Sequence, residues 1–325
     1  MTTRRQFIAA SITGLTGAGG LSSVLAQVLA RPAKILLGFS AGGSNDYLAR
    51  QMAERLRGTY APSVIVENRV GAQGRIAATA VKLADPDGSV LLQSNSSTMT
   101  LYQHIFKEMS YDPMTDFAPV SALANFDYVL AVRDDLQAAS LGQFIDWCKG
   151  NPKNANYASP AHGSAPHFVG LMLAREANIP LVHVPFKGAA PAVQALLGGQ
   201  ISAYIGTYSD VVAHLPGKKI RILSSSGPGR SPFTPDIPTF VEQGLKEVES
   251  RQWYGISVPA RTPEPIITAL NQAIVAALQT EAMQKSLQSQ AMEAAGSTPA
   301  EFAARIRRES SKWAAVVKAA NFTLE

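Results

Sequence analysis

The chain has 325 residues, a formal net charge of +5 at pH 7 and one cysteine, Cys148. A single cysteine excludes an intrachain disulfide, and a mild charge without a dense Lys/Arg run gives no reason to expect a nucleic-acid partner. About 295 residues follow the N-terminal segment described next, which exceeds one typical hydrophobic core and predicts two domains.

Residues 1–30 predict an export signal peptide. Arg4 and Arg5 precede a run of small and apolar residues without acidic side chains. Ala26 and Ala30 each end an A-x-A-like cleavage pattern. Polar and glycine interruptions make the run too weak for a membrane span. The arginine pair resembles a twin-arginine signal, with an ordinary Sec signal as the alternative. We expect a periplasmic protein whose net charge falls from +5 to +3, because two arginines leave with the signal.

The segment 34–47 predicts the first strand–turn–helix unit of the mature chain. An apolar run at 35–37 leads through Gly42 and Gly43 into a helix whose apolar residues recur every four positions, at Leu48, Met52 and Leu56. Glycines allow a ligand to approach the backbone, and the first N–H groups of a helix lack intrahelical partners. Together with the helix dipole, they predict an anion-binding site.

Short β-branched runs then alternate with helical stretches along the chain. Strands are predicted at 63–66 and 90–92, and the polar tract Ser94–Ser97 follows the second strand. Further strands are predicted at 127–132, 156–158, 181–184, 201–205 and 220–223, with helices at 140–149, 166–178, 189–198 and from Pro263 onward. This alternation predicts an α/β protein with mostly parallel sheets, whose ligand crevice lies at the carboxyl ends of the strands.

The same first turn also matches the G-x-S-x-G pattern of serine hydrolases, with Ser40 as the nucleophile. His167, His183 or Asp210 would then have to supply the base and the acid. However, an α/β-hydrolase builds part of its oxyanion hole from an earlier strand–helix loop, and no strand is predicted earlier in the mature chain. A serine hydrolase is therefore the alternative to a solute receptor, and an interaction module is a third class.

The five histidines, at positions 104, 162, 167, 183 and 214, show none of the spacings typical of zinc sites. The chain also lacks a Walker A motif and a G-x-G-x-x-G motif. We therefore expect neither a cofactor nor a metal. His162 and His167 flank a loop of small residues, and we expect them to contact a ligand; the alternative is a structural role in the loop or the helix cap.

A series of ordered motifs resembles one family, the extracytoplasmic solute receptors of tripartite tricarboxylate transporters, also called the Bug family. The first turn resembles the family's P-F-x-P-G-G-x-x-D, and residues 66–72 resemble V-E-N-R-P-G-A. Residues 84–88 resemble A-x-P-D-G. The motifs at 111–120, 183–188, 196–200 and 253–255 follow in the same order. The similarity extends from about Pro32 to the last helix.

This resemblance implies an α/β, two-lobed type II periplasmic-binding-protein fold with a ligand cleft between the lobes. Lobe one would be discontinuous, comprising 31–126 and 252–325, and lobe two would comprise 127–251. The protein would be a monomer without enzymatic activity that captures a small organic carboxylate for a membrane permease of the tripartite tricarboxylate class. Backbone N–H groups and hydroxyls would hold the carboxylate, and the lobes would close over it.

The resemblance places the binding loops at 39–46, 94–97 and 159–167 and after the strand that ends at Ile205. The expected ligand-binding residues are Phe39, Ser40, Ala41, Gly42, Gly43, Ser44, Asp46, Ser94, Asn95, Ser96, Ser159, His162, Gly163, Ser164, His167, Gly206 and Thr207. Asp46 is expected mainly to order its loop, and Gln252 to reach the cleft. The family often has an aspartate where this chain has Gly206, which argues against an amino-acid ligand. We favour a di- or polycarboxylate, or an aromatic carboxylate.

Overall fold

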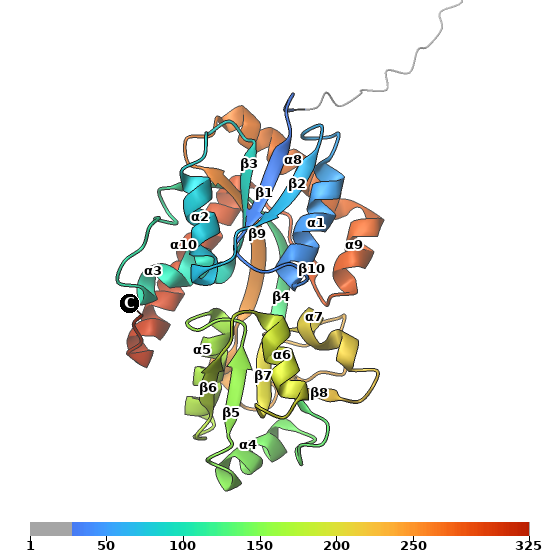
Figure 1. Cartoon of the computed structure of the whole chain (residues 1–325), viewed down its shortest axis with the longest axis vertical. Coiled ribbons are helices and arrows are strands. Elements are labelled where there is room, and N and C mark those ends of the chain that lie inside the picture. Colours follow the sequence, from blue (N-terminus) through green and yellow to red (C-terminus); the bar gives the residue numbers. More distant parts are fainter. Residues whose placement is uncertain (1–27, 325) are drawn as a thin grey trace, which may run out of the picture.

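The computed structural model describes residues 28–324 (Figure 1). Most of the predicted signal peptide, residues 1–27, therefore lies outside the described residues. Among the described residues, no helix combines the length and the apolar character that a membrane crossing needs.

The N-terminal strands form a parallel sheet, as predicted. β1 (Ala33–Leu37) lies between β2 (Val64–Asn68) and β3 (Val90–Asn95) and is parallel to both. Helices α1 (Ser44–Leu56) and α2 (Arg75–Lys82) connect them. The residues at four-residue spacing in α1, namely Leu48, Met52 and Leu56, are fully buried. Their burial confirms the predicted apolar face and anchors the helix whose first turn follows β1.

Two long antiparallel strands connect the upper and lower parts of the molecule in Figure 1. β4 (Phe117–Arg133) pairs with β9 (Arg251–Pro259) from Phe117 to Asp127. From Tyr128 onward, β4 pairs with β7 (Ala203–Thr207) instead. The sequence predicted only the second half of β4 as a strand. The prediction of mostly parallel sheets is therefore correct for β1, β2 and β3 but wrong for these joining strands, which are antiparallel.

The lower part repeats the strand–helix alternation. β5 (Asn156–Ser159) is parallel to β6 (Val182–Pro185) and to β7, whereas β8 (Ile220–Ser225) is antiparallel to β4. The helices here are α4 (Leu141–Gly150), α5 (Ala165–Glu176), α6 (Ala189–Leu197) and α7 (Tyr208–Val211). The three longer helices lie within a few residues of their predicted positions. The short α7 was not predicted.

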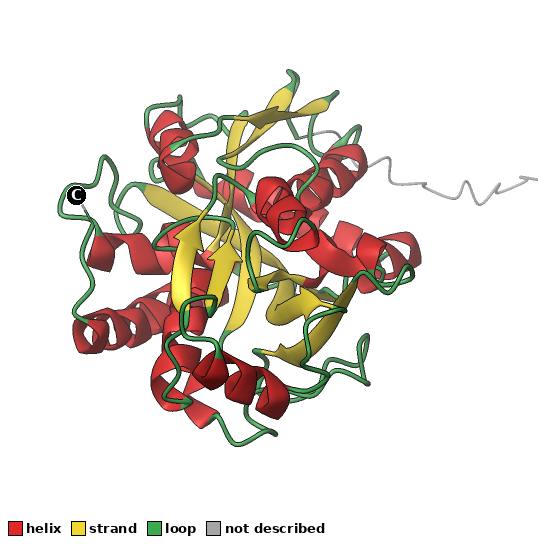
Figure 2. Ribbon diagram, turned by 60° about the horizontal axis from the view of Figure 1, so that its bottom comes forward, coloured by secondary structure: helices red, strands yellow, loops and turns green. Residues whose placement is uncertain are grey.

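The C-terminal segment returns to the upper part. It contains α8 (Glu264–Gln279), α9 (Glu281–Gln288), β10 (Glu293–Ala294) and α10 (Pro299–Ala320). β10 pairs with β4. Phe302 of α10 packs edge-on against Trp253 of β9, with 4.9 Å between the ring centroids. The remaining short helices are η1 (Ala72–Gly74), η2 (Ser97–Leu101), α3 (Tyr102–Ile105), η3 (Val212–His214) and η4 (Lys246–Val248). Figure 2 shows helices on the outside of the strands.

Candidate functional site

A cavity of about 250 Å³ lies where segments of both parts of the molecule meet at the carboxyl ends of strands. Small and polar residues dominate its wall. The lining residues are Phe39, Ser40, Ala41, Gly42, Gly43, Ser44, Asn45, Asn95, Ser97, Tyr128, Pro160, Ala161, Ser164, Pro166, Gly188, Ala189, Ala190, Thr207, Ser209, Asp210 and Tyr254. A larger groove of about 1020 Å³ lies between α5 and α10, but charged side chains of both signs line it. The smaller cavity is therefore the better carboxylate site.

Four helices begin at this cavity. Their N-cap residues, Gly43 of α1, Ser164 of α5, Gly188 of α6 and Thr207 of α7, all belong to its wall. A helix N-terminus carries partial positive charge and N–H groups without intrahelical partners. No lysine or arginine occurs among the described residues that line the cavity. Helix N-termini therefore supply the positive potential that a bound anion requires.

The α1 turn is ordered by Asp46, as the sequence predicted. The Asp46 carboxylate accepts a hydrogen bond from the Gly42 N–H at 3.0 Å, and it accepts others from Arg50 and from Asn68. Burial opposes ionisation of Asp46, but these hydrogen bonds and the charge of Arg50 outweigh it and lower its pKa. Asp46 is buried and does not line the cavity. It therefore holds the loop from behind while the glycines face the cavity.

Among the described residues that line the cavity, Asp210 is the only one with a charged side chain. Burial raises the pKa of its carboxyl group, and hydrogen bonds from the Tyr204 hydroxyl at 2.7 Å and the Thr207 N–H at 2.9 Å oppose this rise. A side chain at position 206 would collide with Tyr204, because a Cβ built on Gly206 lies 2.1 Å from the Tyr204 hydroxyl oxygen. The Tyr204 hydroxyl thus fills the space beside Gly206 that a side chain would need.

Two hydrogen bonds cross the cavity. The Thr207 hydroxyl donates to the Ser44 hydroxyl at 3.4 Å, and Ser44 also lies 2.6 Å from the Tyr254 hydroxyl. On another side, the Ala165 N–H donates to the Ser97 hydroxyl at 3.1 Å. The first turn of α5, which follows the predicted binding loop at 159–167, does not leave all of its N–H groups to a ligand. One of them instead binds Ser97 and links the two sides of the cavity.

The predicted binding residues divide into two groups. Those in the cavity wall are Phe39, Ser40, Ala41, Gly42, Gly43, Ser44, Asn95, Ser164 and Thr207. Those behind the wall are Asp46, Ser94, Ser96, Ser159, His162, Gly163, His167 and Gly206. Several of the second group are engaged elsewhere. Ser96, for example, hydrogen-bonds the predicted cleft residue Gln252, which is itself buried. Because side chains alternate along a strand, neighbouring loop residues do not all face the same space.

Sequence reasoning missed several wall residues. Tyr128 and Tyr254 come from the long joining strands, and Gly188, Ala189 and Ala190 from the start of α6. Ser209 and Asp210 come from the short helix α7. A glycine before a helix, as at Gly188, is the same signal that identified Gly43, and it would have revealed the α6 start. The two tyrosines gave no such signal, because aromatic residues in strands are typical of cores.

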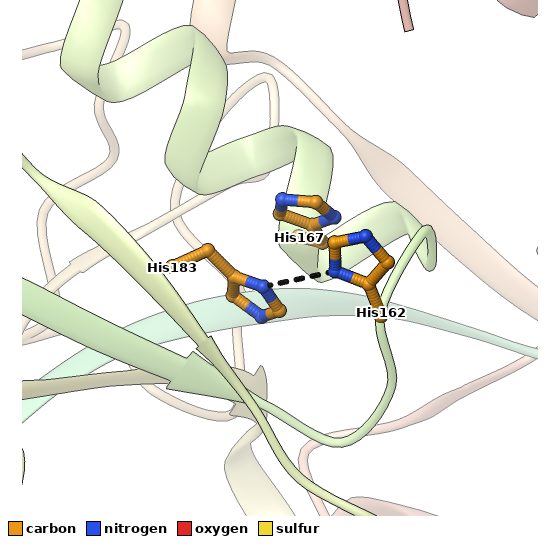
Figure 3. Close-up of side chains that lie close together, drawn as sticks. All are labelled: His162, His167 and His183. Atoms are coloured by element: carbon orange, nitrogen blue, oxygen red, sulfur yellow. Dashed lines mark hydrogen bonds between the residues drawn. The ribbon is translucent and has the colours of Figure 1, made fainter. Parts of the chain in front are cut away.

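Three histidines meet behind the cavity wall (Figure 3). His162, His167 and His183 each place a ring nitrogen within 4.8 Å of the others. The expectation that histidine spacing excludes a metal cluster was therefore incomplete, because it considered only distance along the chain. Burial, followed by the neighbouring histidines, lowers the pKa of His167 to about 2 and that of His183 to about 4. The three rings are consequently neutral near pH 7.

The hydrolase interpretation has no geometric support. Within residues 28–324, the side-chain hydrogen bonds of histidines lead to Ser310, Ser159, the Gly163 N–H and the neighbouring histidine, and none leads to Ser40. Asp210 is paired with Tyr204 and Thr207 rather than with a histidine. A serine nucleophile needs a base within hydrogen-bond reach.

Comparisons with known proteins found similarity over nearly the whole chain. The sequence model described as "Tripartite tricarboxylate transporter family receptor" matches residues 48–322. Protein BugT of Bordetella pertussis (strain Tohama I) is 31% identical over 290 residues, which are 89% of each chain. The structure "R. palustris Rpa4515 with adipate" has a TM-score of 0.86 and 28% identity, covering 90% of this chain and 98% of that one.

A second structure, "MatC (Rpa3494) from Rhodopseudomonas palustris with bound malate", has a TM-score of 0.79 and 30% identity, covering 88% of this chain and 99% of that one. These similarities extend over nearly the whole chain, including both parts of the molecule that contribute to the cavity. They confirm the two-lobed fold of type II periplasmic binding proteins and do not support the hydrolase alternative. The chain belongs to the tripartite tricarboxylate transporter receptor family.

Proposed function

We propose that this protein is a periplasmic receptor that captures a small aliphatic dicarboxylate for uptake. The observation that carries the proposal is the convergence of four helix N-caps on one cavity whose described wall contains no lysine or arginine. Backbone N–H groups and helix dipoles hold anions without a charged side chain. Two solved relatives, with bound adipate and bound malate, support the choice of a dicarboxylate.

The arrangement of the N-termini gives each carboxylate a separate position. The start of α1, at Gly43, belongs to the upper part of the molecule, and the start of α6, at Gly188, belongs to the lower part (Figure 1). One carboxylate would bind at α1 and the other at α6 or α5. Position 206 has no room for an acid beside Tyr204, and Oδ2 of Asp210 already accepts hydrogen bonds from Tyr204 and from the Thr207 N–H. Both features support a ligand without an amino group.

We further propose that the cleft closes between two lobes, 31–126 with 252–325 and 127–251. The exchange of β4 from β9 to β7 at Asp127 and Tyr128 supports this division. Ligand shifts such an equilibrium only through contacts that both lobes make in the closed state. The Thr207–Ser44 and Ala165–Ser97 hydrogen bonds join the two proposed lobes directly and would favour the closed state beside such ligand contacts. The protein would act as a monomer and without turnover, and would deliver its ligand to a membrane permease of the transporter class.

Export would precede function. Cleavage after Ala26 is supported over cleavage after Ala30, because Leu29 is buried and its N–H donates to the Tyr60 carbonyl at 2.8 Å. The shorter mature chain would lose this contact. Mass spectrometry of the protein recovered from the periplasm distinguishes the two cleavage sites. Replacement of Arg4 and Arg5 by lysine tests the export route, because loss of the periplasmic protein indicates a twin-arginine signal.

A thermal-shift screen tests the ligand class. A ligand that binds only the native state raises the unfolding temperature by mass action. We expect malate, succinate and adipate to raise it, and expect benzoate, glutamate and neutral amides of the same length to raise it less. Stabilisation by amino acids or monocarboxylates alone would contradict a two-carboxylate site. Calorimetry on the strongest hit then gives the affinity used below.

A further inference from the structure

The histidine cluster joins three separate elements of the lower part. His162 lies in the loop after β5, His167 lies in the first turn of α5, and His183 lies in β6 (Figure 3). None of the three histidines lines the ligand cavity. The predicted ligand contacts of His162 and His167 therefore do not explain why the three side chains lie together. His167 is fully buried, whereas His162 and His183 are half-buried. A small solute thus has a route to the cluster from solvent.

Hydrogen bonds assign the protons of the cluster. The Ser159 hydroxyl donates to the Ala161 carbonyl at 3.1 Å, so it accepts from Nε2–H of His183 at 2.8 Å. Nδ1 of His183 therefore carries a free lone pair, and it lies 3.4 Å from Nδ1 of His162. The centroids of these two rings are 5.6 Å apart, and Figure 3 shows the two nitrogens facing each other. A hydrogen bond between these two nitrogens therefore requires that Nδ1 of His162 carries the shared proton.

We propose that His162, His167 and His183 form a binding site for a divalent transition-metal ion such as Zn²⁺, Ni²⁺ or Cu²⁺. Neutral imidazole is a preferred ligand of these ions. With metal–nitrogen bonds of about 2.0–2.1 Å, two nitrogens separated by 3.4 Å subtend an angle of about 110° at the metal, close to the tetrahedral value. The ion would replace the proton shared by His162 and His183.

His167 supplies the third ligand after a rotation of its side chain. Its ring now stacks on His183 with 3.9 Å between the centroids, and its Nδ1 accepts the Gly163 N–H at 3.0 Å. Turning out of this stack exchanges one hydrogen bond for one coordinate bond. Solvent water completes the coordination shell on the half-buried side. Ser159 fixes the orientation of His183, as partners of metal-binding histidines commonly do.

The site would influence the ligand cavity through a shared loop. Pro160, Ala161 and Ser164 line the cavity, and His162 and His167 belong to the same loop and helix start. A metal ion would tie this segment to His183 in β6. It would thereby restrict the motion of the α5 N-terminus, which also makes the closing contact with Ser97. This consequence rests on the proposed receptor function, whereas metal binding itself does not.

Metal titration of the tag-free, chelator-treated protein tests the proposal. We expect calorimetry to give one Zn²⁺ per chain, and Cu²⁺ electron paramagnetic resonance to show nitrogen splitting from histidine. His162→Gln, His183→Gln and His167→Phe should each weaken Zn²⁺ binding at least ten-fold, and phenylalanine retains the ring stack. His214→Gln, which changes a histidine outside the cluster, is the matched control. Circular dichroism without metal confirms that each variant is folded.

Several results would overturn the metal site. One is the absence of Zn²⁺ binding by the unmodified chain, and another is Zn²⁺ binding by the double variant His162→Gln/His183→Gln that equals that of the unmodified chain. A third is a Cu²⁺ spectrum without imidazole nitrogen splitting. Unchanged binding by His167→Phe would overturn the three-histidine arrangement. Because the titration is performed without carboxylate, its outcome is independent of the ligand screen. Failure of the screen and failure of the metal site are therefore distinguishable.

Discussion

The Ser44 hydroxyl accepts a hydrogen bond from the hydroxyl of Thr207, a residue 163 positions later, at 3.4 Å. Ser44 is the first residue of α1, and Thr207 is the N-cap of α7. The same Ser44 oxygen lies 2.6 Å from the Tyr254 hydroxyl on β9. One serine thus connects a helix of the upper part, a helix of the lower part and a strand that joins them. If the lobes close as proposed, we expect closure of the cavity to depend on this small group of hydroxyls.

Thr207→Val removes the hydroxyl from this group while keeping the side-chain shape. Loss of a hydrogen bond of about 1 kcal/mol predicts a roughly five-fold weaker ligand affinity. Thr207→Ser retains the hydroxyl and should therefore keep the ligand affinity of the unmodified protein. Thr59→Val, at an exposed turn, is the control. Calorimetry gives the affinity, and small-angle scattering gives the closure. A radius of gyration that does not change when ligand saturates the unmodified protein would indicate a rigid, preformed pocket.

Gly43→Val tests the anion site at α1. A Cβ at this position has ordinary space, because its nearest neighbour is the Ser40 carbonyl oxygen at 3.9 Å, and Gly43 has a negative φ of −82°. The fold should therefore tolerate valine. The added methyl groups would lie beside the cavity and should weaken ligand affinity at least ten-fold. Gly150→Val, at the end of α4, is the control. Undiminished affinity of Gly43→Val in calorimetry would reject the α1 site.

Asp127 makes the stability of the joining strands depend on pH. It lies opposite Arg251 where β4 changes partner, and its Oδ1 has no hydrogen-bond partner among the described residues. Burial raises the pKa of Asp127 to about 6, against an opposing effect of Arg251. The folded state therefore binds this proton more tightly than the unfolded state. The resulting stabilisation is complete below the ordinary pKa of an aspartate and is lost as the pH rises through about 6.

Asp127→Asn should abolish this pH dependence. At pH 7.5 the variant is expected to be more stable than the unmodified protein by up to about 3 kcal/mol, since the shift is about two units. Near pH 4 the difference should largely disappear. Urea unfolding at both pH values measures the difference in the free energy of unfolding. Asp146→Asn, at an exposed position of α4, is the control. A variant that is equally destabilised at both pH values would indicate that Asp127 has an essential contact as an anion.

Ser40 is expected to behave as an ordinary hydroxyl. It is exposed in the cavity wall, and none of the described histidines hydrogen-bonds it. We expect no labelling by a fluorophosphonate and no ester hydrolysis, with or without ligand. Ser40→Ala should change ligand affinity by less than ten-fold. Ester turnover that disappears in Ser40→Ala would contradict the receptor function and restore the hydrolase alternative.

Local sequence patterns determined most elements of this protein. Four-residue spacing of Leu48, Met52 and Leu56 identified the buried face of α1, and Gly42 and Gly43 identified its N-terminus at the cavity. Such patterns are readable because a helix or a strand repeats over a few residues. The ordered family motifs then identified the two-lobed fold. The prediction failed for the first half of β4, whose small and polar residues carry no clear strand pattern.

Only the tertiary structure decided which residues meet. Tyr128 and Tyr254 reach the cavity because β4 and β9 cross between its two sides, a pairing that spans more than a hundred positions. His183 reaches His162 and His167 because parallel pairing of β5 and β6 sets Tyr157 beside His183. Strand register depends on side-chain burial across the whole sheet rather than on neighbours in the chain. Spacing along the sequence therefore could not reveal a cluster that the register creates.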